Sequence, residues 1–302
     1  MKQPELHYDP RHHILRIDSL EIPLTHPDKV IFHQKGYTKM DLIRYYLEVR
    51  ERMMHYAKGR PLSMKRFPEG CPGNSFFQRN KPAWAPKWIH SSRLGIEKKA
   101  DYILPDHIEV FIWLTNLGVI EFHAAQVRQP HLTQPDVLVF DLDPPPGQAF
   151  AVVRDFALEA RKVIESFGYT AYVKTSGKKG AHILCPVKPL WSFDQIFEAA
   201  RDIGEEMIRK IPESTLRISK KIRKNKILVD IYRNHSYQSM VLPYTLRATQ
   251  EASVSMPLHW KSFAAIDDPK VFHMESVLPL IVKNDPWRDF YHQAAHLHTE
   301  KN

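Results

Sequence analysis

The segment Asp136-Val-Leu-Val-Phe-Asp-Leu-Asp143 constrains the fold more than any other part of this sequence. Its apolar run predicts a buried β-strand, and the Pro144-Pro-Pro-Gly147 that follows must end that strand. Side chains two residues apart in a strand lie on one face, about 6.6 Å apart along the backbone. The strand therefore carries two carboxylates, Asp141 and Asp143, to its end, where both can reach a single divalent metal site.

A third carboxylate interrupts another apolar strand pattern, Ile227-Leu-Val-Asp-Ile-Tyr232. If the two strands are neighbours, Asp230 converges with Asp141 and Asp143. Clustered carboxylates repel one another, which raises their pKa values unless a cation neutralises them, and oxygen ligands suit Mg²⁺ or Mn²⁺. Three such acids indicate metal-dependent phosphoryl transfer. The alternative is structural: Asp143 caps the following turn, and Asp230 pairs with a nearby lysine or arginine.

The spacing of apolar residues between these strands predicts helices over 153–167 and 192–211 and a hairpin over 171–185. The order strand, helix, hairpin, helix, strand is typical of an α+β fold, in which helices cover one face of a mostly antiparallel sheet. We expect the active face to be the other one. Upstream, a capping-box pattern at Thr38 predicts a helix that continues to Gly59. Short strands are expected over 14–18, 61–67 and 119–123, and a short helix near 270–282 in an otherwise irregular C-terminal part.

The predicted hairpin turns at Ser176-Gly-Lys-Lys-Gly180 and carries His182 on its second strand. Two glycines permit a tight backbone, so that N–H groups, a hydroxyl, two lysines and an imidazole could face a phosphate. A Walker A loop is excluded because a strand, not a helix, follows the turn. The alternative is a solvated hairpin tip.

The sequence carries a formal net charge of +9 and a pI near 9.4, which indicates an anionic partner, most often nucleic acid. No stretch approaches the roughly 20 apolar residues of a membrane span, so a cytoplasmic protein is expected. Phe76 and Phe77 lie among cationic residues and can stack on unpaired bases, or alternatively plug the core. The basic tract 220–226 precedes the Asp230 strand and favours contact with a polyanion, although such tracts are often only solvated loops.

Three segments together resemble the motifs of the archaeo-eukaryotic primase superfamily, and most closely the polymerase domain of bacterial DNA ligase D. They are Phe140-Asp-Leu-Asp-Pro-Pro-Pro-Gly147, Thr175-Ser-Gly-Lys-Lys-Gly-Ala-His182 and Val229-Asp-Ile-Tyr-Arg-Asn234. Further similarity covers most of the chain, in Leu24-Thr-His-Pro-Asp-Lys-Val30, Gly59-Arg-Pro-Leu62, Lys65-Arg-Phe-Pro-Glu-Gly70, Phe76-Phe-Gln78, Pro243-Tyr-Thr-Leu-Arg247 and Val254-Ser-Met-Pro-Leu258.

The resemblance implies a primase-polymerase that fills or extends broken DNA ends in non-homologous end joining, typically favouring ribonucleotides and manganese. Its fold would be an RNA-recognition-motif-like catalytic core with an antiparallel sheet and flanking helices, joined to an N-terminal α/β module. We expect residues 1–302 to form a single domain of this kind. Within it, the N-terminal module would span about 1–118, the catalytic core 119–260 and a C-terminal extension 261–302.

The resemblance also assigns roles to individual residues. Asp141, Asp143 and Asp230 would hold two Mn²⁺ or Mg²⁺ ions. Ser176, Lys179 and His182 would grip the triphosphate, with Lys65, Arg223 and Arg247 as further nucleotide contacts. Lys29 and Lys39 would bind the 5′-phosphate at the far side of a gap, and Phe76 and Phe77 would meet the template. One departure is His26, where the family often has asparagine.

The implied partners are DNA ends with a 5′-phosphate, NTPs or dNTPs, an ATP-dependent DNA ligase and a Ku-like end-binding protein, in the cytoplasm at the nucleoid. No ligase or nuclease segment accompanies the chain, so it works as a separate subunit or was cut from a larger polypeptide. Two alternatives stay open. The chain could be a primase that starts without a primer, or a non-catalytic module that binds DNA ends.

Overall fold

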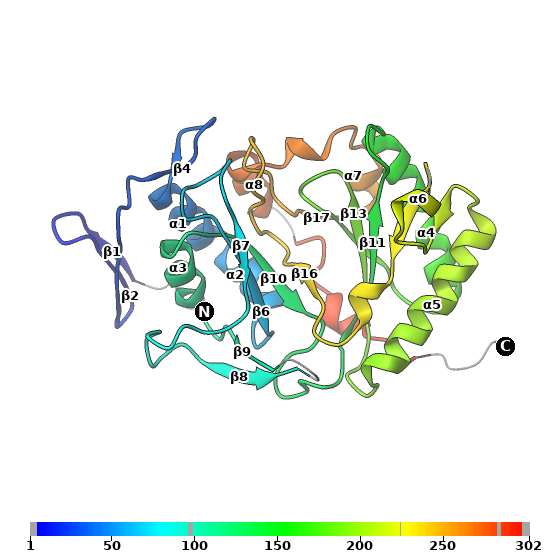
Figure 1. The fold of residues 1–302 in the computed structure, drawn as a ribbon, viewed down its shortest axis with the longest axis horizontal. Helices are drawn as coiled ribbons and strands as arrows, with labels where there is room; N and C mark the ends of the chain where they lie inside the picture. The colour runs from blue at the N-terminus through cyan, green and yellow to red at the C-terminus, as the bar shows by residue number, and fades with distance from the viewer. Residues whose placement is uncertain (1–4, 96–98, 224, 283–284, 298–302) are drawn as a thin grey trace.

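Two β-sheets with helices packed against them form the body of the molecule, as Figure 1 shows. The structure is a computed structural model and describes residues 5–95, 99–223, 225–282 and 285–297. The smaller of the two sheets has the antiparallel order β16-β10-β6-β7. Its strands are β16 (Ser239–Val241), β10 (Val119–Ala125), β6 (Leu62–Arg66) and β7 (Phe76–Gln78).

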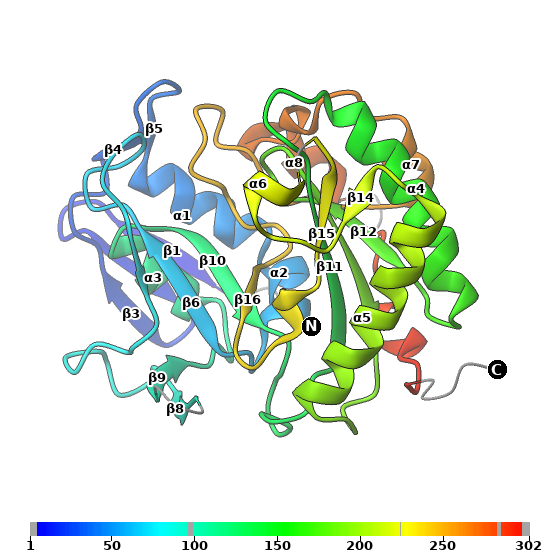
Figure 2. The same cartoon turned by 45° about the vertical axis from the view of Figure 1, so that its right-hand side comes forward.

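The larger sheet has six strands in the order β14-β15-β11-β13-β12-β17, antiparallel except for the β14–β15 pair. Figure 2 shows helices α4 and α5 on one side of it and α6 beside β15. Its strands are β14 (Ser214–Thr215), β15 (Ile227–Asp230), β11 (Val137–Asp143), β13 (Ala181–Pro186), β12 (Tyr172–Thr175) and β17 (Pro257–Leu258).

The helices of the described residues include two that begin with capping boxes, at Thr38, as predicted, and at Ser192. They are α1 (Lys39–Glu48), α2 (Arg50–Ala57), α3 (Glu109–Asn116), α4 (Phe150–Ser166), α5 (Phe193–Lys210), α6 (Lys220–Arg223), α7 (Trp260–Ala264) and α8 (Met274–Ile281), with 3₁₀ turns η1 (Tyr232–Asn234), η2 (Pro269–Val271) and η3 (Phe290–Gln293). Within the described ranges, none of these helices could cross a membrane.

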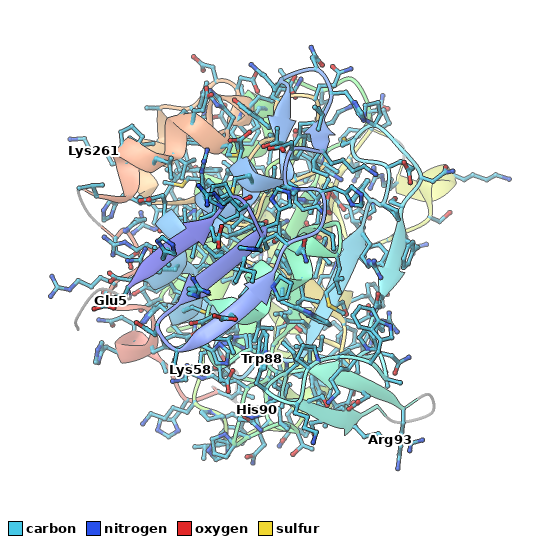
Figure 3. The ribbon with its side chains drawn as sticks, turned by 90° about the vertical axis from the view of Figure 1, so that its left-hand side faces the viewer. Glu5, Lys58, Trp88, His90, Arg93 and Lys261 are labelled. Atoms are coloured by element: carbon cyan, nitrogen blue, oxygen red, sulfur yellow. The ribbon has the colours of Figure 1, made fainter. Side chains whose placement is uncertain are left out.

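The N-terminal part also forms one three-stranded sheet and two two-stranded sheets. The three-stranded sheet faces the viewer in Figure 3, where Arg93 marks the β8–β9 hairpin below it. Their strands are β1 (Leu6–Asp9), β2 (Ile14–Ile17) and β3 (Leu20–Pro23), then β4 (Val30–Phe32) with β5 (Tyr37–Thr38), and β8 (Ser91–Leu94) with β9 (Ala100–Ile103).

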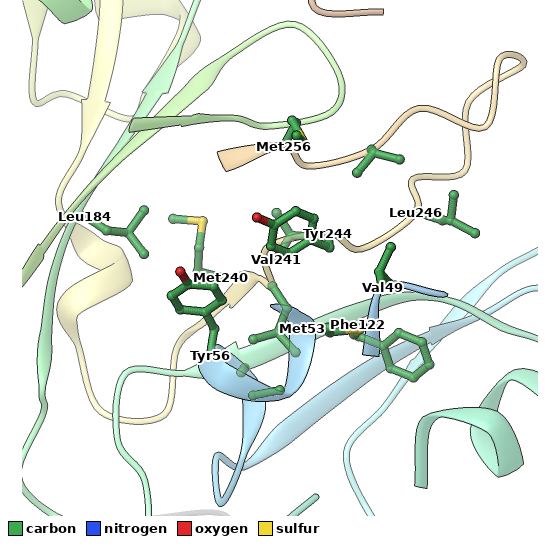
Figure 4. Packing of buried hydrophobic residues seen from close by; sticks show 14 of the residues in the cluster. Val49, Met53, Tyr56, Phe122, Leu184, Met240, Val241, Tyr244, Leu246 and Met256 are labelled. Atoms are coloured by element: carbon green, nitrogen blue, oxygen red, sulfur yellow. The ribbon is translucent and has the colours of Figure 1, made fainter. Parts of the chain in front are cut away.

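Alternation along the strands sorts the side chains into a helix-covered face and an inner face. In β10, Phe122 packs against Tyr46 of α1 and Phe111 of α3, at ring-centroid distances of 5.3 and 4.8 Å. Glu121 and His123 therefore point the other way, towards the larger sheet. Figure 4 shows the apolar part of the space between the sheets, where Tyr56, Leu184 and Met240 lie close together.

The same alternation places Asp141 and Asp143 on the inner face of β11, together with the buried Val137 and Val139. Because Leu138, Phe140 and Leu142 are also fully buried, both faces of this strand lie inside the protein. The inner face is thus apolar at the start of the strand and acidic at its end. This confirms the predicted α+β fold and places the acids on the face that was expected to be active, whose activity stays a prediction.

Several details differ from the sequence prediction. The predicted helix from Thr38 to Gly59 is divided at Val49, whose backbone (φ −86°, ψ 3°) separates α1 from α2. Strand β15 ends at Asp230, and Tyr232 begins a 3₁₀ turn instead of continuing the strand. The C-terminal part predicted to be irregular supplies β16 to the smaller sheet and β17 to the larger one. Since β10 pairs with β6, the proposed boundary at residue 118 lies next to a shared sheet and stays a prediction.

Candidate active site

Sheet register aligns four polar side chains in one row across the larger sheet. Asp141 of β11 lies directly opposite Asp230 of β15 on one side and His182 of β13 on the other. His182 is in turn opposite Lys174 of β12. Directly paired residues share a face. One row therefore runs across the inner face through Lys174, His182, Asp141 and Asp230. Asp143 lies on the same face, two residues after Asp141 along β11.

Arg233 at present neutralises part of the acidic cluster. Its Nε lies 3.2 Å from Oδ2 of Asp141 and 3.3 Å from Oδ2 of Asp230. The structure thus contains the arginine partner that the alternative explanation of Asp230 required. That partner does not reach Asp143 in the described residues, which leaves a third acid beside the pair.

The pKa values of the three acids diverge. Burial and the charges of Asp141 and Asp230 raise the pKa of Asp143 to about 6. Burial also raises the pKa of Asp230, against the opposing effect of Arg233. Burial acts upwards on Asp141 too, but His182 and Arg233 outweigh it and lower the pKa to about 2. The cluster therefore carries uncompensated repulsion, which a cation would relieve.

The chemistry of this donor set fits a hard divalent cation. It offers only carboxylate oxygens, from adjacent strands, and their repulsion is visible in the raised pKa values of Asp143 and Asp230. Across the described part of the chain, no three histidine, cysteine or acidic side chains lie close enough together to hold a metal ion without rearrangement. Arg233 occupies the position between the two opposed acids instead.

The hairpin turn between β12 and β13 is built around Ser176. Its Oγ accepts hydrogen bonds from the backbone N–H groups of Lys178, at 3.2 Å, and Gly180, at 3.0 Å. These two N–H groups, which the sequence suggested as phosphate donors, are therefore used inside the turn. A Cβ on Gly180 would lie 2.3 Å from the carbonyl oxygen of Leu142, so only glycine fits against β11.

Gly177 is equally constrained, by Arg247. Gly177 has φ +71°, and a Cβ there would lie 2.6 Å from Cγ of Arg247. Arg247 is buried, and its Nη1 donates to the carbonyl oxygen of Ser176. Its Nε is buried without a partner among the described residues. The turn thus brings together Ser176 and Arg247, two of the nucleotide contacts that the resemblance implies, whereas Lys179 is exposed.

Glu121 of β10 is surrounded by basic side chains, a cluster that the sequence did not predict. Its Oε1 lies 3.2 Å from Nζ of Lys178 and accepts from the backbone N–H of Ala248 at 3.1 Å. Its Oε2 lies 3.2 Å from Nε2 of His123 and 3.3 Å from Nη2 of Arg247. This carboxylate links the smaller sheet to the turn of the larger one.

The pKa of Glu121 lies well below its usual range. Burial opposes ionisation, but the hydrogen bond with His123 and the charges of Arg247 and Lys178 outweigh it. Only one signal could have revealed this residue: an acid that shares a face with His123 within the apolar pattern Val119–His123.

Lys65 on β6 and the aromatic pair Phe76 and Phe77 on the edge strand β7 lie near this cluster. Lys65 is directly opposite Glu121 in register. Its Nζ lies 5.7 Å from the ring centroid of Phe77, and Phe77 also contacts His123 at 5.5 Å. Phe76 and Phe77 are 47% and 59% exposed. The aromatic pair is therefore a surface feature and not a plug in the core.

The remaining predicted contacts are Arg223 and the two lysines Lys29 and Lys39. Arg223 is buried on α6 and donates to the carbonyl oxygen of Pro144 at 3.4 Å, next to the end of β11. Lys224 of the basic tract lies outside the described residues. Lys29 directly precedes β4 and Lys39 begins α1, and the backbone N–H of Lys39 donates to the carbonyl oxygen of Lys29 at 2.9 Å. In Figure 2, β4 and α1 lie to the left of β15.

The two lysines differ in their surroundings. Nζ of Lys29 donates to the carbonyl oxygen of Pro68 at 2.7 Å. Lys39 is buried, and its Nζ donates to the carbonyl oxygen of Thr25 and lies 3.4 Å from Oδ1 of Asn116. Burial and the charge of Lys29 lower the pKa of Lys39 to about 8. His26, the departure noted in the sequence, adopts a positive φ of 48° beside this pair.

Comparisons with known proteins agree with the resemblance found in the sequence. The family model described as "LigD, primase-polymerase domain" matches residues 38–287. The bifunctional non-homologous end joining protein LigD of Bacillus subtilis is 30% identical over 289 residues, covering 94% of this chain and 45% of that protein. The multifunctional non-homologous end joining protein LigD of Mycolicibacterium smegmatis is 28% identical, covering 84% of this chain and 33% of that protein.

A solved structure, the polymerase domain of Mycobacterium tuberculosis ligase D in complex with DNA, superposes with a TM-score of 0.83. It is 27% identical in sequence, and the match covers 90% of this chain and 99% of that one. The chain therefore spans less than half the length of these curated relatives but nearly all of the isolated polymerase domain.

Proposed function

The chain belongs to the LigD primase-polymerase family, and from this membership we propose that it is a template-directed nucleotidyltransferase that fills or extends DNA ends in non-homologous end joining. Membership supports a DNA-repair polymerase of primase type. The proposal adds the reaction, its substrates and the residues that carry it. The observation that supports it most is the register pair of Asp141 and Asp230 beside Asp143, on the face that His182 shares.

Asp141, Asp143 and Asp230 are the residues that would hold two Mn²⁺ or Mg²⁺ ions. Bound there, such ions would supply a lowered pKa for the primer 3′-hydroxyl and charge neutralisation at the triphosphate. Before binding, Arg233 holds Asp141 and Asp230 in place by contacting both. The proposal therefore includes displacement of Arg233 from these two carboxylates when the metal ions bind.

Cationic and polar groups from both sheets would bind the triphosphate. His182 is buried beside Asp141, Arg247 is buried against the turn at Ser176, and Lys65 of β6 lies opposite Glu121. Ser176 and Lys179 on the turn and Arg223 on α6 would add further contacts. Donors that are fixed before the reaction stabilise negative charge that develops during phosphoryl transfer, because they need no reorganisation.

The DNA would be held at two places. Phe76 and Phe77 are exposed aromatic rings that would stack on template bases, and Lys65 and Arg66 beside them attract the backbone. Lys29 and Lys39 would bind the 5′-phosphate across the gap. An ATP-dependent ligase and a Ku-like end-binding protein would be the partners in the complete repair reaction.

The test is extension of a gapped duplex with Mn²⁺, comparing rNTPs with dNTPs and a 5′-phosphate with a 5′-hydroxyl at the far side of the gap. We expect templated incorporation that the 5′-phosphate stimulates. Efficient synthesis on bare single-stranded DNA without a primer would identify a primase instead. Binding of DNA ends without any incorporation would identify a non-catalytic module.

A further inference from the structure

We propose that Lys174 is a positioning residue, which holds the imidazole of His182 in the one tautomer that can donate a hydrogen bond to a bound phosphate. The inference rests on the proposed function only in its last step, the contact between His182 and the nucleotide. Its first step, the state of the imidazole, concerns this chain alone.

Lys174 is completely buried. Nζ lies 2.6 Å from Nδ1 of His182 and 2.6 Å from Oγ of Ser255. An unpartnered amino group at this depth would be costly, and burial together with Arg247 lowers the pKa of Lys174 well below its usual range. Its two hydrogen bonds are therefore what makes the position tolerable.

The direction of each bond follows from the partners. Oγ of Ser255 donates its only proton to the carbonyl oxygen of Thr175 at 2.8 Å, so it must accept from Lys174. On the other side of the ring, Nε2 of His182 lies 3.3 Å from Oδ1 of Asp141. A carboxylate only accepts hydrogen bonds, so the proton of the neutral ring is on Nε2.

Nδ1 is then a lone-pair acceptor, and Lys174 is its donor. The assignment does not depend on the charge of Lys174, because a neutral amine still has two N–H groups, one for each partner. The other tautomer would set a lone pair of Nε2 against the carboxylate of Asp141. Register supports this order, since Lys174, His182 and Asp141 are direct neighbours on three successive strands.

The tautomer matters because phosphate oxygens accept hydrogen bonds and do not donate them at neutral pH. A ring with its proton on Nε2 carries its donor at the acid end of the sheet, where the triphosphate would take over from Asp141 as acceptor once that carboxylate binds the metal ions. A ring with its proton on Nδ1 would present a lone pair there and repel it. Lys174 thus contributes to nucleotide binding without touching the nucleotide.

The test is two-bond ¹H–¹⁵N NMR of protein labelled at histidine, with the His182 signals assigned by comparison with His182→Gln. In the parent protein we expect an acceptor-type Nδ1 and a protonated Nε2. Lys174→Met, which keeps a similar volume without the donor, should give a mixture of tautomers and raise KM for the nucleotide roughly tenfold at nearly constant kcat. The control Lys162→Met alters an exposed lysine on α4 and should leave both unchanged.

A parent ring with its proton on Nδ1 would overturn the proposal, as would a Lys174→Met protein with an unchanged tautomer. Ser255→Ala removes the other partner of Lys174 and should keep the Nε2 proton, so loss of the tautomer there would also count against it. If Lys174→Met fails to fold, the parent and Ser255→Ala spectra decide. Because the NMR readout needs no turnover, an inactive parent would contradict the proposed function without touching the assignment.

Discussion

Asp141 and Asp230 face each other across neighbouring antiparallel strands, and the guanidinium of Arg233 lies within 3.3 Å of both carboxylates. A cation of the protein itself therefore stands between two acids that we propose as metal ligands. Such an arrangement stabilises the metal-free protein, because two opposed buried carboxylates would otherwise repel each other. It also means that a metal ion and Arg233 compete for the same oxygens.

Replacing Arg233 with methionine should therefore strengthen metal binding and weaken the metal-free protein. We expect a lower melting temperature without metal and a larger increase in melting temperature on adding Mn²⁺ than in the parent. Thermal unfolding with and without Mn²⁺ measures both effects. Arg209→Met, at an exposed arginine of α5, is the control. An equal Mn²⁺-induced increase in parent and Arg233→Met would show that Arg233 does not compete with metal.

Glu121→Gln should destabilise the protein at neutral pH, because it leaves Arg247, Lys178 and His123 around an uncharged amide. Breaking a buried ion pair costs about 3–5 kcal/mol, and the amide should recover part of that. The pKa of Glu121 is lowered from 4.5 by folding, so its ionised form contributes stability above pH 4.5 and loses it as the pH falls further.

Urea unfolding at several pH values tests this linkage. The difference in free energy of unfolding between parent and Glu121→Gln should be greatest near pH 7 and shrink below about pH 4.5. A difference that is independent of pH would mean that the charge of Glu121 does not stabilise the cluster.

Gly177→Ala and Gly36→Ala form a matched pair, since both glycines have φ +71°. Gly36 has nothing within 4 Å of an added Cβ, so alanine should cost only the strain of the left-handed backbone, about 1 kcal/mol. At Gly177 the same strain is joined by contact with Arg247 at 2.6 Å. We expect Gly177→Ala alone to raise KM for the nucleotide, measured by steady-state incorporation. Equal effects of the two substitutions would argue against a role for Arg247.

The stimulation by a 5′-phosphate should weaken as the pH rises through about 8, where Lys39 loses its proton. The sign follows because the protonated amine attracts the phosphate, and burial together with Lys29 lowers the pKa of Lys39 from 10.5 into the accessible range. Lys39→Arg should flatten this dependence, since arginine stays charged. Comparing 5′-phosphorylated with unphosphorylated gaps from pH 7 to pH 9.5 cancels effects of pH on chemistry. Lys35→Arg, at an exposed lysine nearby, should behave like the parent.

The sequence predicts the acids well because strand alternation is strictly periodic. Asp141 and Asp143 had to share a face, and Asp230 joined them once its strand proved to be the neighbour. Lys174 and Glu121 were missed because each is a single charge within an apolar strand, and only register shows what it opposes. Alternation predicts which side chains share a face of a strand, but it does not predict which residues they oppose on the neighbouring strands.

Short strands and helix breaks were missed for a different reason. Strands β16 and β17 have three and two residues, too few for a periodic pattern, and they exist because β10 and β12 offer pairing edges. The helix division at Val49 leaves the apolar stripe intact on both sides, so periodicity alone predicts one helix. These features come from tertiary contacts.

Single-nucleotide incorporation by Asp141→Ala, measured beside DNA binding, tests the central claim most directly. The control is Asp155→Ala, which removes an exposed acid on α4. We predict that Asp141→Ala reduces Mn²⁺-dependent incorporation at a phosphorylated gap at least a thousandfold, roughly the loss expected for a metal-assisted centre. Its affinity for the DNA should stay within a few-fold of the parent, and Asp155→Ala should be fully active. Incorporation by Asp141→Ala at a rate close to that of the parent would contradict the account.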